Sequence, residues 1–245
     1  MLESIKERVL GIKTCHKDLR LYLNEFLKSK YDHLHWGYWP ALCESENIGL
    51  AQDNLYREIK SYFPNGLRSI IDVGGGIGGT AYLLLKDGYK ALCIVPDKDL
   101  IKLGKIRFPG VDFLRGTAEC FKLKEKFDAA ILIESYQYFT DHPRAISNIA
   151  RNLASSSFMV FAEEFCTYSG SKLREDLLKD YLVREGYSLI VRTDISGKVL
   201  PTCDFLVNYF KGRNQEMAEF WVEKKEKLLS GDIRYLILIF RRDNH

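Results

Sequence analysis

The feature that most constrains this chain of 245 residues is a glycine-rich run, Asp72-Val73-Gly74-Gly75-Gly76-Ile77-Gly78-Gly79-Thr80. It continues the apolar, β-branched segment Ser69–Val73, which we predict to be a strand, and it opens the predicted helix Thr80–Lys86. Glycines allow positive φ angles and let backbone amides approach a ligand closely. The start of a helix adds free N–H groups and positive dipole character. The run therefore predicts a strand–turn–helix unit whose turn faces a ligand.

Beyond this unit, strand-like and helix-like segments alternate. The other predicted strands are Ala91–Val95, Val111–Leu114, Asp128–Ile133, Ser157–Glu163, Ser188–Thr193 and Arg234–Phe240, and the predicted helices among them are Asp97–Ile106, Pro143–Leu153 and Lys172–Arg184. This alternation predicts βαβ units and a doubly wound, mainly parallel α/β sheet with right-handed crossovers. A mixed segment, Asp194–Asp232, interrupts the rhythm before the last strand and contains a helical portion at Gln215–Leu229. We expect this insertion to cap a ligand crevice.

The N-terminal quarter is different in character. Apolar residues recur at helical spacing over Ser4–Lys28 and again over Ile48–Phe63, which predicts helices in both places. An aromatic segment, Tyr31–Pro40, separates them. We therefore expect an N-terminal helical cap with the aromatic segment at 1–66, an α/β core at 67–193, and a lid insertion with the final strand of the same core at 194–245.

Composition limits the classes of function. The chain is 46% hydrophobic and 28% charged, as expected of a globular protein rather than a disordered one. Its formal net charge of +3 does not require a nucleic-acid or membrane partner. No apolar stretch approaches the roughly 20 residues of a membrane-spanning helix. The six cysteines show no metal-ligand spacing. We predict no metal, no membrane span and a cytoplasmic location, and we leave the oligomeric state open.

Several ligands suit a glycine-rich turn. A P-loop would need a lysine near its end, which this run lacks. Gly74, Gly76 and Gly79 satisfy the G-x-G-x-x-G pattern of dinucleotide sites. Asp72 with Gly74, Gly76 and Gly78 also satisfies an acid-x-Gly-x-Gly-x-Gly pattern. A turn without a ligand is the remaining alternative, but so many glycines cost entropy that packing alone rarely justifies.

Three further segments accompany the last of these patterns. They are Gly116-Thr117-Ala118-Glu119, Phe127-Asp128-Ala129-Ala130-Ile131-Leu132-Ile133-Glu134-Ser135 and His33-Leu34-His35-Trp36-Gly37-Tyr38-Trp39. Together with the glycine-rich run, they resemble class I S-adenosylmethionine (SAM)-dependent methyltransferases, in the small-molecule group of tocopherol, sarcosine and natural-product enzymes. The resemblance implies a Rossmann-like methyltransferase fold with a seven-stranded sheet. It also implies SAM as the cofactor, and methyl transfer to N or O of a small-molecule acceptor.

The resemblance also implies which residues surround the cofactor. They are Tyr31, Trp36, Asp72, Gly74, Gly75, Gly76, Gly78, Cys93, Asp97, Thr117, Ala118, Glu119 and Glu134. Cys93 stands at the place in the second strand where such sites usually have an acid for the ribose hydroxyls, so Asp97 or Lys98 would supply that contact. Thr117 replaces the usual aspartate beside the adenine. Asp72 would hold the loop or accept a hydrogen bond from the cofactor's amino group.

The candidate catalytic residues are His35, Tyr38, Tyr138 and Glu164. Tyr138 stands where many similar sequences carry histidine, and Glu164 could face the cavity or water, as could Glu163. The aromatic segment could instead anchor the N-terminal helices to the sheet. A hydroxyl acceptor would benefit from a base, whereas a neutral amine would need none.

Other functions remain open at this point. A protein of this fold could bind SAM without methyl transfer, as a cyclase or a binding module. An NAD(P)-dependent oxidoreductase is a third alternative, although the acid–glycine register and the Glu134-Ser135 turn fit SAM better. A nucleic-acid methyltransferase is disfavoured because the chain has neither the Asn/Asp-Pro-Pro-Tyr motif nor a basic stripe.

Overall fold

The computed structural model describes residues 32–40 and 47–243. The elements in chain order are α3 (Ile48–Ser61), β1 (Ser69–Val73), α4 (Gly79–Lys86), β2 (Lys90–Val95), α5 (Lys98–Arg107), β3 (Asp112–Arg115), β4 (Phe127–Ile133), the 3-10 turn η2 (Tyr136–Tyr138), α6 (His142–Asn152), β5 (Leu153–Cys166), α7 (Glu175–Arg184), β6 (Tyr187–Asp194), α8 (Ser196–Val199), α9 (Pro201–Phe210), α10 (Gln215–Ser230) and β7 (Ile233–Arg242). The helices expected over Ser4–Lys28 lie outside the described residues.

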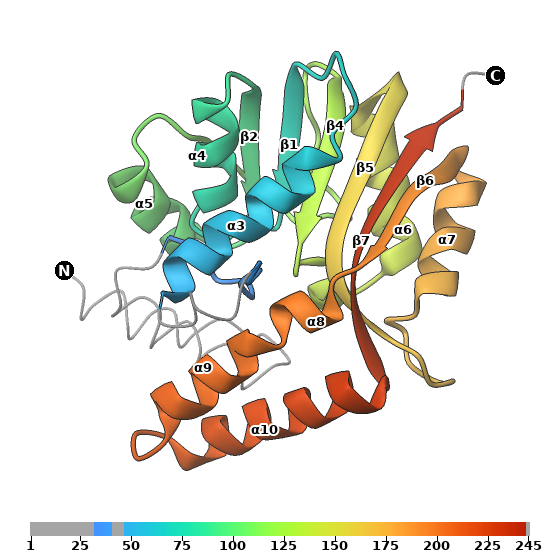
Figure 1. The fold of residues 1–245 in the computed structure, drawn as a ribbon. Helices are drawn as coiled ribbons and strands as arrows, with labels where there is room; N and C mark the ends of the chain where they lie inside the picture. Colours follow the sequence, from blue (N-terminus) through green and yellow to red (C-terminus); the bar gives the residue numbers. More distant parts are fainter. Residues whose placement is uncertain (1–31, 41–46, 244–245) are drawn as a thin grey trace.

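The strands form one seven-stranded sheet in the order β3-β2-β1-β4-β5-β7-β6 (Figure 1). Strands β1 to β5 pair in parallel, whereas β7 runs antiparallel to both β5 and β6. The chain moves outward from β1 to β3 and then returns to β4 on the other side of β1. Ligands bind at this kind of switch point in doubly wound sheets, outside the carboxyl ends of the strands. The predicted doubly wound, mainly parallel sheet is confirmed.

Helices cover both faces of the sheet, as the near-continuous apolar strands require. Side chains alternate along each strand, so that Ile70 and Ile131 enter one hydrophobic core while Ile71 and Leu132 enter the other. The first core lies under α3, α4 and α8–α10, and the second under α6 and α7. The sheet is therefore a rigid floor for whatever lies at its carboxyl edge.

The insertion before the last strand forms three helices rather than the single helical portion we predicted. Helices α8, α9 and α10 lie together below the sheet in Figure 1, near the lower ends of β5 and β7. Proline at the first position of α9 starts a new helix there, because its fixed φ suits that position. Trp221 of α10 meets Trp36 edge-on, with ring centroids 5.2 Å apart. The insertion thus reaches the aromatic segment.

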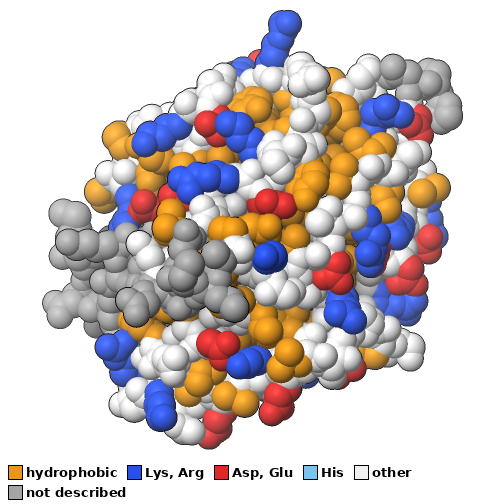
Figure 2. Space-filling view, in the orientation of Figure 1, with side chains coloured by type: hydrophobic (Ala, Val, Ile, Leu, Met, Phe, Trp, Pro, Cys, Tyr) orange, Lys and Arg blue, Asp and Glu red, His pale blue; other side chains and the backbone are white. Residues whose placement is uncertain are grey.

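The surface carries charges of both signs. Figure 2 shows Lys and Arg side chains interspersed with Asp and Glu over the visible face, without a patch of one sign. None of the helices in the described ranges is both long and apolar enough to span a membrane.

Candidate active site

The glycine-rich turn between β1 and α4 has the backbone shape that its sequence predicts. Gly74, Gly76 and Gly78 have φ angles of 78°, 58° and 90°, in the left-handed region that favours glycine. The amide of Gly74 donates to the carbonyl of Ile94 on β2 over 2.8 Å. A Cβ on Gly74 would lie 2.5 Å from Cβ of Ser135, which follows β4. The turn is therefore held against the ends of both neighbouring strands.

Asp72 lies directly beneath this turn and is 1% exposed. A Cβ on Gly75 would lie 2.1 Å from Oδ2 of Asp72, so the absence of a side chain leaves room for the carboxyl group. Burial raises the pKa of Asp72 to about 7. Within the described part of the chain, Oδ2 has no hydrogen-bond partner. Buried polar atoms are normally paired, so this oxygen is available to a donor from a bound ligand.

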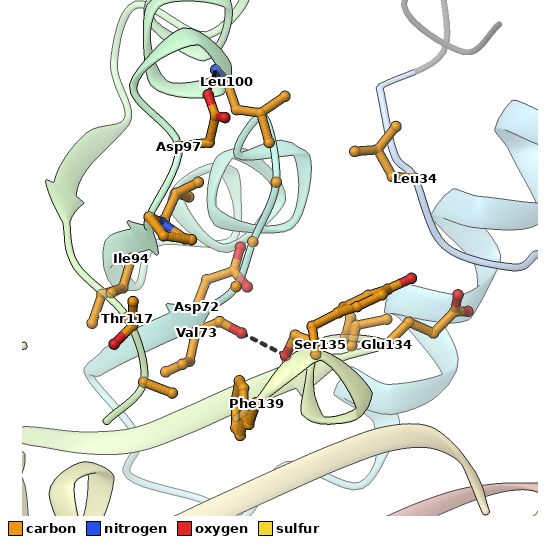
Figure 3. Close-up of a pocket in the computed structure, with 18 of the residues that line it drawn as sticks. Leu34, Asp72, Val73, Ile94, Asp97, Leu100, Thr117, Glu134, Ser135 and Phe139 are labelled. Carbon is orange, nitrogen blue, oxygen red and sulfur yellow. Dashed lines mark hydrogen bonds between the residues drawn. The ribbon is translucent and has the colours of Figure 1, made fainter. Parts of the chain in front are cut away.

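A cavity of about 550 Å³ opens above the turn (Figure 3). Its walls come from the ends of β1, β2, β3 and β4 and from the aromatic segment. Figure 3 shows Asp97 and Leu100 at one end, Thr117 and Ile94 along one wall, and Leu34 across the opening from Glu134. The cavity thus occupies the switch point of the sheet.

The wall that carries Thr117 continues along the loops after β3 and β4, on the side of the cavity away from Glu134 (Figure 3). Thr117, Ala118, Glu119 and Cys120 line it, together with the segment 139–141. A carboxylate oxygen of Glu119 accepts from the backbone amide and the hydroxyl of Thr140, over 2.9 and 3.0 Å. Asn148 donates to the carbonyl of Ala118 over 2.9 Å. These bonds hold the loop that carries Thr117.

Asp97 caps helix α5 as its position predicted. Its Oδ1 atom accepts from the amides of Asp99 and Leu100 over 2.6 and 3.0 Å. The residue also lines the cavity. One carboxylate oxygen therefore caps the helix, and neither of these two hydrogen bonds uses the other oxygen.

Glu134, the residue after β4, lines the opposite end of the cavity. Its φ of 51° makes it the one described non-glycine residue with a positive φ, a conformation that costs free energy and is concentrated at functional sites. Oε1 of Glu134 accepts from the backbone amide of Trp36 over 2.6 Å and from the hydroxyl of Tyr235 over 2.7 Å. Burial raises the pKa of Glu134 to about 8.

Two residues that support this end were not predicted to do so. Ser135 donates from Oγ to the carbonyl of Val73 over 2.7 Å and lines the cavity beside Gly74 (Figure 3). Glu163 accepts from the amides of Ser135 and Tyr136 over 2.8 and 2.9 Å, and it is 1% exposed. We expected Glu163 to face the cavity or water, and that expectation is wrong. The two glutamates are adjacent at the end of a strand, and nothing in the sequence indicates that Glu163 would bind backbone amides instead of facing the cavity or water.

The segment 32–40 crosses the cavity and is fastened on both sides. A Cβ on Gly79 would lie 2.2 Å from the carbonyl oxygen of Asp32, so the segment passes directly over the start of α4. On α3, Gln52 donates to the carbonyl of His35 over 2.5 Å. On α9, Thr202 accepts from the amide of Gly37 over 3.0 Å and from the indole of Trp39 over 2.9 Å. The segment therefore roofs the glycine-rich turn.

His35 is the candidate catalytic residue of this segment that lines the cavity. Its Nδ1 lies 2.8 Å from the carbonyl oxygen of Trp36, which can only accept, so Nδ1 carries the proton. Nε2 then holds a lone pair, and it is buried without a hydrogen-bond partner in the described ranges. Burial, with His33 as a second cause, lowers the pKa of His35 to about 3. The ring is therefore a neutral hydrogen-bond acceptor.

Most of the predicted site residues come together in this cavity. Those that line it are His35, Asp72, Gly74, Gly75, Gly76, Asp97, Thr117, Ala118, Glu119, Glu134 and Tyr138. Those that do not are Trp36, Tyr38, Gly78, Cys93 and Glu164. Tyr31 lies outside the described residues.

The residues away from the cavity each have another role. Cys93 pairs with Asp72 inside the sheet, two residues before β2 ends at Val95, and it is fully buried. Glu164 forms an ion pair with Lys224 of α10 over 2.6 Å. Tyr38 packs toward α3, where its amide donates to Ala51. Trp36 packs against Trp221 and Tyr235, and Gly78 packs against Phe113.

Comparison with known proteins finds a matching domain family, similar sequences and similar folds. Residues 71–161 match the model of a methyltransferase domain. The chain is similar to the O-methyltransferase resE of Aspergillus sclerotiorum, with 25% identity over 216 residues that cover 78% of this chain and 81% of that protein. Its fold is similar to the crystal structure of the [4+2]-cyclase SpnF, with a TM-score of 0.77, 19% identity and coverage of 98% and 97%. It is also similar to a sarcosine dimethylglycine methyltransferase from Galdieria sulphuraria, with a TM-score of 0.76, 15% identity and coverage of 94% and 99%.

Proposed function

We propose that this chain, which is a class I SAM-dependent methyltransferase, transfers the methyl group to a hydroxyl oxygen of a small-molecule acceptor. We choose oxygen rather than nitrogen as the methylated atom because of His35. Its ring lines the cavity, and its unprotonated Nε2 has no hydrogen-bond partner in the described ranges. Relatives such as the Aspergillus enzyme are named O-methyltransferases, which supports the same choice. A neutral amine would not need such an acceptor group.

The residues around the cavity suit SAM. The unpaired Oδ2 of Asp72 can accept from the amino group of its methionine part, and the glycine-rich turn leaves space that a Cβ would fill. We propose that Asp97 accepts from the ribose hydroxyls and that the Thr117–Cys120 loop holds the adenine. When bound, SAM supplies a methyl group on a positively charged sulfur that is already activated for displacement.

The chain's own contribution is to orient the acceptor and to exclude water. The Nε2 atom of His35 would accept a hydrogen bond from the acceptor hydroxyl, orient one of its oxygen lone pairs, and take up the hydroxyl proton when the oxygen–methyl bond forms and the carbon–sulfur bond of SAM breaks. Tyr138, which is 40% exposed, stands at the opening and contacts the acceptor from the other side. The segment 32–40 forms the roof. We propose the insertion at 194–245 as the remaining wall, and the cytoplasm as the place where the enzyme works.

Methyl-label transfer from SAM to a panel of phenols, alcohols and amines tests this proposal. Replacing His35→Ala and Tyr138→Phe together should lower kcat on hydroxyl acceptors about 10²-fold or more, the usual range for loss of acid–base assistance. S-adenosylhomocysteine (SAH) binding should stay near the wild-type value, which shows that the variant is folded. Full turnover in the double variant would show that both assignments are wrong. Methylation of amines alone would contradict the choice of oxygen.

A protein that binds SAM without methyl transfer is the second candidate. The similarity to the [4+2]-cyclase SpnF extends to the fold alone, and the relatives named as methyltransferases favour transfer. An NAD(P) site is disfavoured because the matching domain family and the similar sequences named here are methyltransferases.

A further inference from the structure

Glu134 is a partly buried ionisable group that neither binds the proposed acceptor nor belongs to the glycine-rich turn. It precedes Ser135, whose side chain lies against Gly74, so it stands at the glycine-turn end of the cavity. The Thr117–Cys120 loop lies at the other end. If SAM lies as proposed, with its adenine by that loop, its sulfur faces the end that Glu134 lines.

Both hydrogen bonds of Glu134 use the same carboxylate oxygen, in a residue that lines the cavity. Both donors, the amide of Trp36 and the hydroxyl of Tyr235, bond to Oε1. Neither of these two donors uses Oε2. The strained φ of 51° is the backbone conformation in which the side chain reaches this position.

The charges around Glu134 come from several elements. Glu163 and Glu164 of β5 both disfavour its ionisation, while Tyr235 of β7 stabilises the ionised form by its hydrogen bond. Lys224 of α10 is paired with Glu164, over 2.6 and 2.8 Å, and His35 of segment 32–40 stays neutral. Tyr138 of η2 lines the same cavity. Among the described residues no ion pair includes Glu134. Burial first, and these two carboxylates next, raise its pKa to about 8.

We infer that the carboxyl group of Glu134 distinguishes the methyl donor from the spent product by charge. SAM carries a positive sulfonium, whereas SAH carries an uncharged thioether, and the two ligands are otherwise alike. Ionised Glu134 attracts the sulfonium and has no such attraction for the thioether. The donor is therefore retained and the product released more readily as Glu134 ionises. This inference rests on the proposed SAM-dependent function.

Calorimetric titration of the full chain with SAM and with SAH tests the inference without any acceptor. The ratio of the SAH Kd to the SAM Kd cancels the contributions of the groups that the two ligands share. In the wild type this ratio should rise on the order of tenfold between about pH 6.5 and about pH 9, the effect of one unit charge acting across roughly 10 Å of protein. Glu134→Gln keeps an oxygen for Trp36 and Tyr235 but cannot ionise, so its ratio should not change with pH.

Two further variants sharpen the test. Tyr235→Phe keeps the carboxyl group but removes one donor to its charged form, so the rise should occur at higher pH than in the wild type. Glu125→Gln makes the same chemical change on an exposed residue that pairs with Lys90, and it should follow the wild type.

The outcomes separate the inference from the proposed function. If the wild type binds neither ligand, the proposed function is wrong and the inference falls with it. If the wild type binds both ligands and Glu134→Gln shows the same rise in the ratio, only the inference is overturned. If Glu134→Gln does not fold, a Tyr235→Phe curve that matches the wild type overturns it equally.

Discussion

Replacement of Gly75 by alanine tests whether the carboxyl group of Asp72, which lies against Gly75, holds the cofactor. Gly75 does not have a positive φ, so alanine is compatible with the backbone there. The added Cβ would lie 2.1 Å from Oδ2 and 2.4 Å from Cγ of Asp72. These distances are far below van der Waals contact, so the carboxyl group of Asp72 must leave its position.

Two effects follow from this displacement. Forcing an extra methyl group into a packed site typically costs about 1–3 kcal/mol of stability. Moving Asp72 also removes its proposed charge-assisted bond to the amino group of SAM, which is worth about 1.5–3 kcal/mol. We therefore expect SAM affinity to fall roughly 10- to 100-fold. The thermal midpoint should fall as well, while the variant remains folded.

Calorimetric titration with SAM and thermal melting, both on the full chain, measure these two effects. Gly110→Ala is the matched control, because Gly110 lacks a positive φ and a Cβ there would meet nothing within 4 Å. This control should change stability by less than about 0.5 kcal/mol and leave binding unchanged. Wild-type affinity in Gly75→Ala would refute the proposal that Asp72 holds the cofactor.

Two other predictions concern stability. Thr202→Val should cost about 2–4 kcal/mol by leaving the buried donors of Gly37 and Trp39 without their acceptor, whereas Thr202→Ser should stay close to the wild type in urea unfolding. The pKa values of Glu134 and Glu163 are raised to about 8, so the folded state holds protons that the unfolded state releases. The stability from these protons is complete below the ordinary pKa of glutamate and is lost as the pH rises through about 8, so the thermal midpoint should fall from about pH 6.5 to about pH 9. An unchanged midpoint across this range would contradict the burial of both carboxyl groups.

The sequence predicted the sheet well because parallel strands buried on both faces have a strong pattern. The first strand was predicted with the same bounds that the structure shows, Ser69–Val73. The fifth was predicted too short, since β5 begins at Leu153, immediately after α6, and its early residues Ser155 and Ser156 are polar and exposed. The polar residues at its start made β5 look shorter in the sequence than its pairing with β4 and β7 makes it in the structure.

The parts of the candidate site that depend on local sequence could be predicted. The glycine-rich turn and the cap at Asp97 depend on local sequence, so their patterns were sufficient. The second strand was predicted to end at Val95, as β2 does, but the position of the usual ribose acid was assigned to Cys93, which lies inside the sheet. The separate roles of Glu163 and Glu164 depend on the Ser135 amide and on Lys224, which are 28 and 60 positions away in the chain. Such partners can be found only after folding.

Binding of SAM tests the central claim most directly. Calorimetric titration of the purified chain with SAM, SAH and NAD(H) should show saturable binding of the first two ligands and none of the nicotinamide pair. Competition between SAM and SAH should show one shared site, and Gly75→Ala should weaken both. Binding of NAD(H) without SAM, or wild-type SAM affinity after the turn is altered, would contradict the account of this cavity.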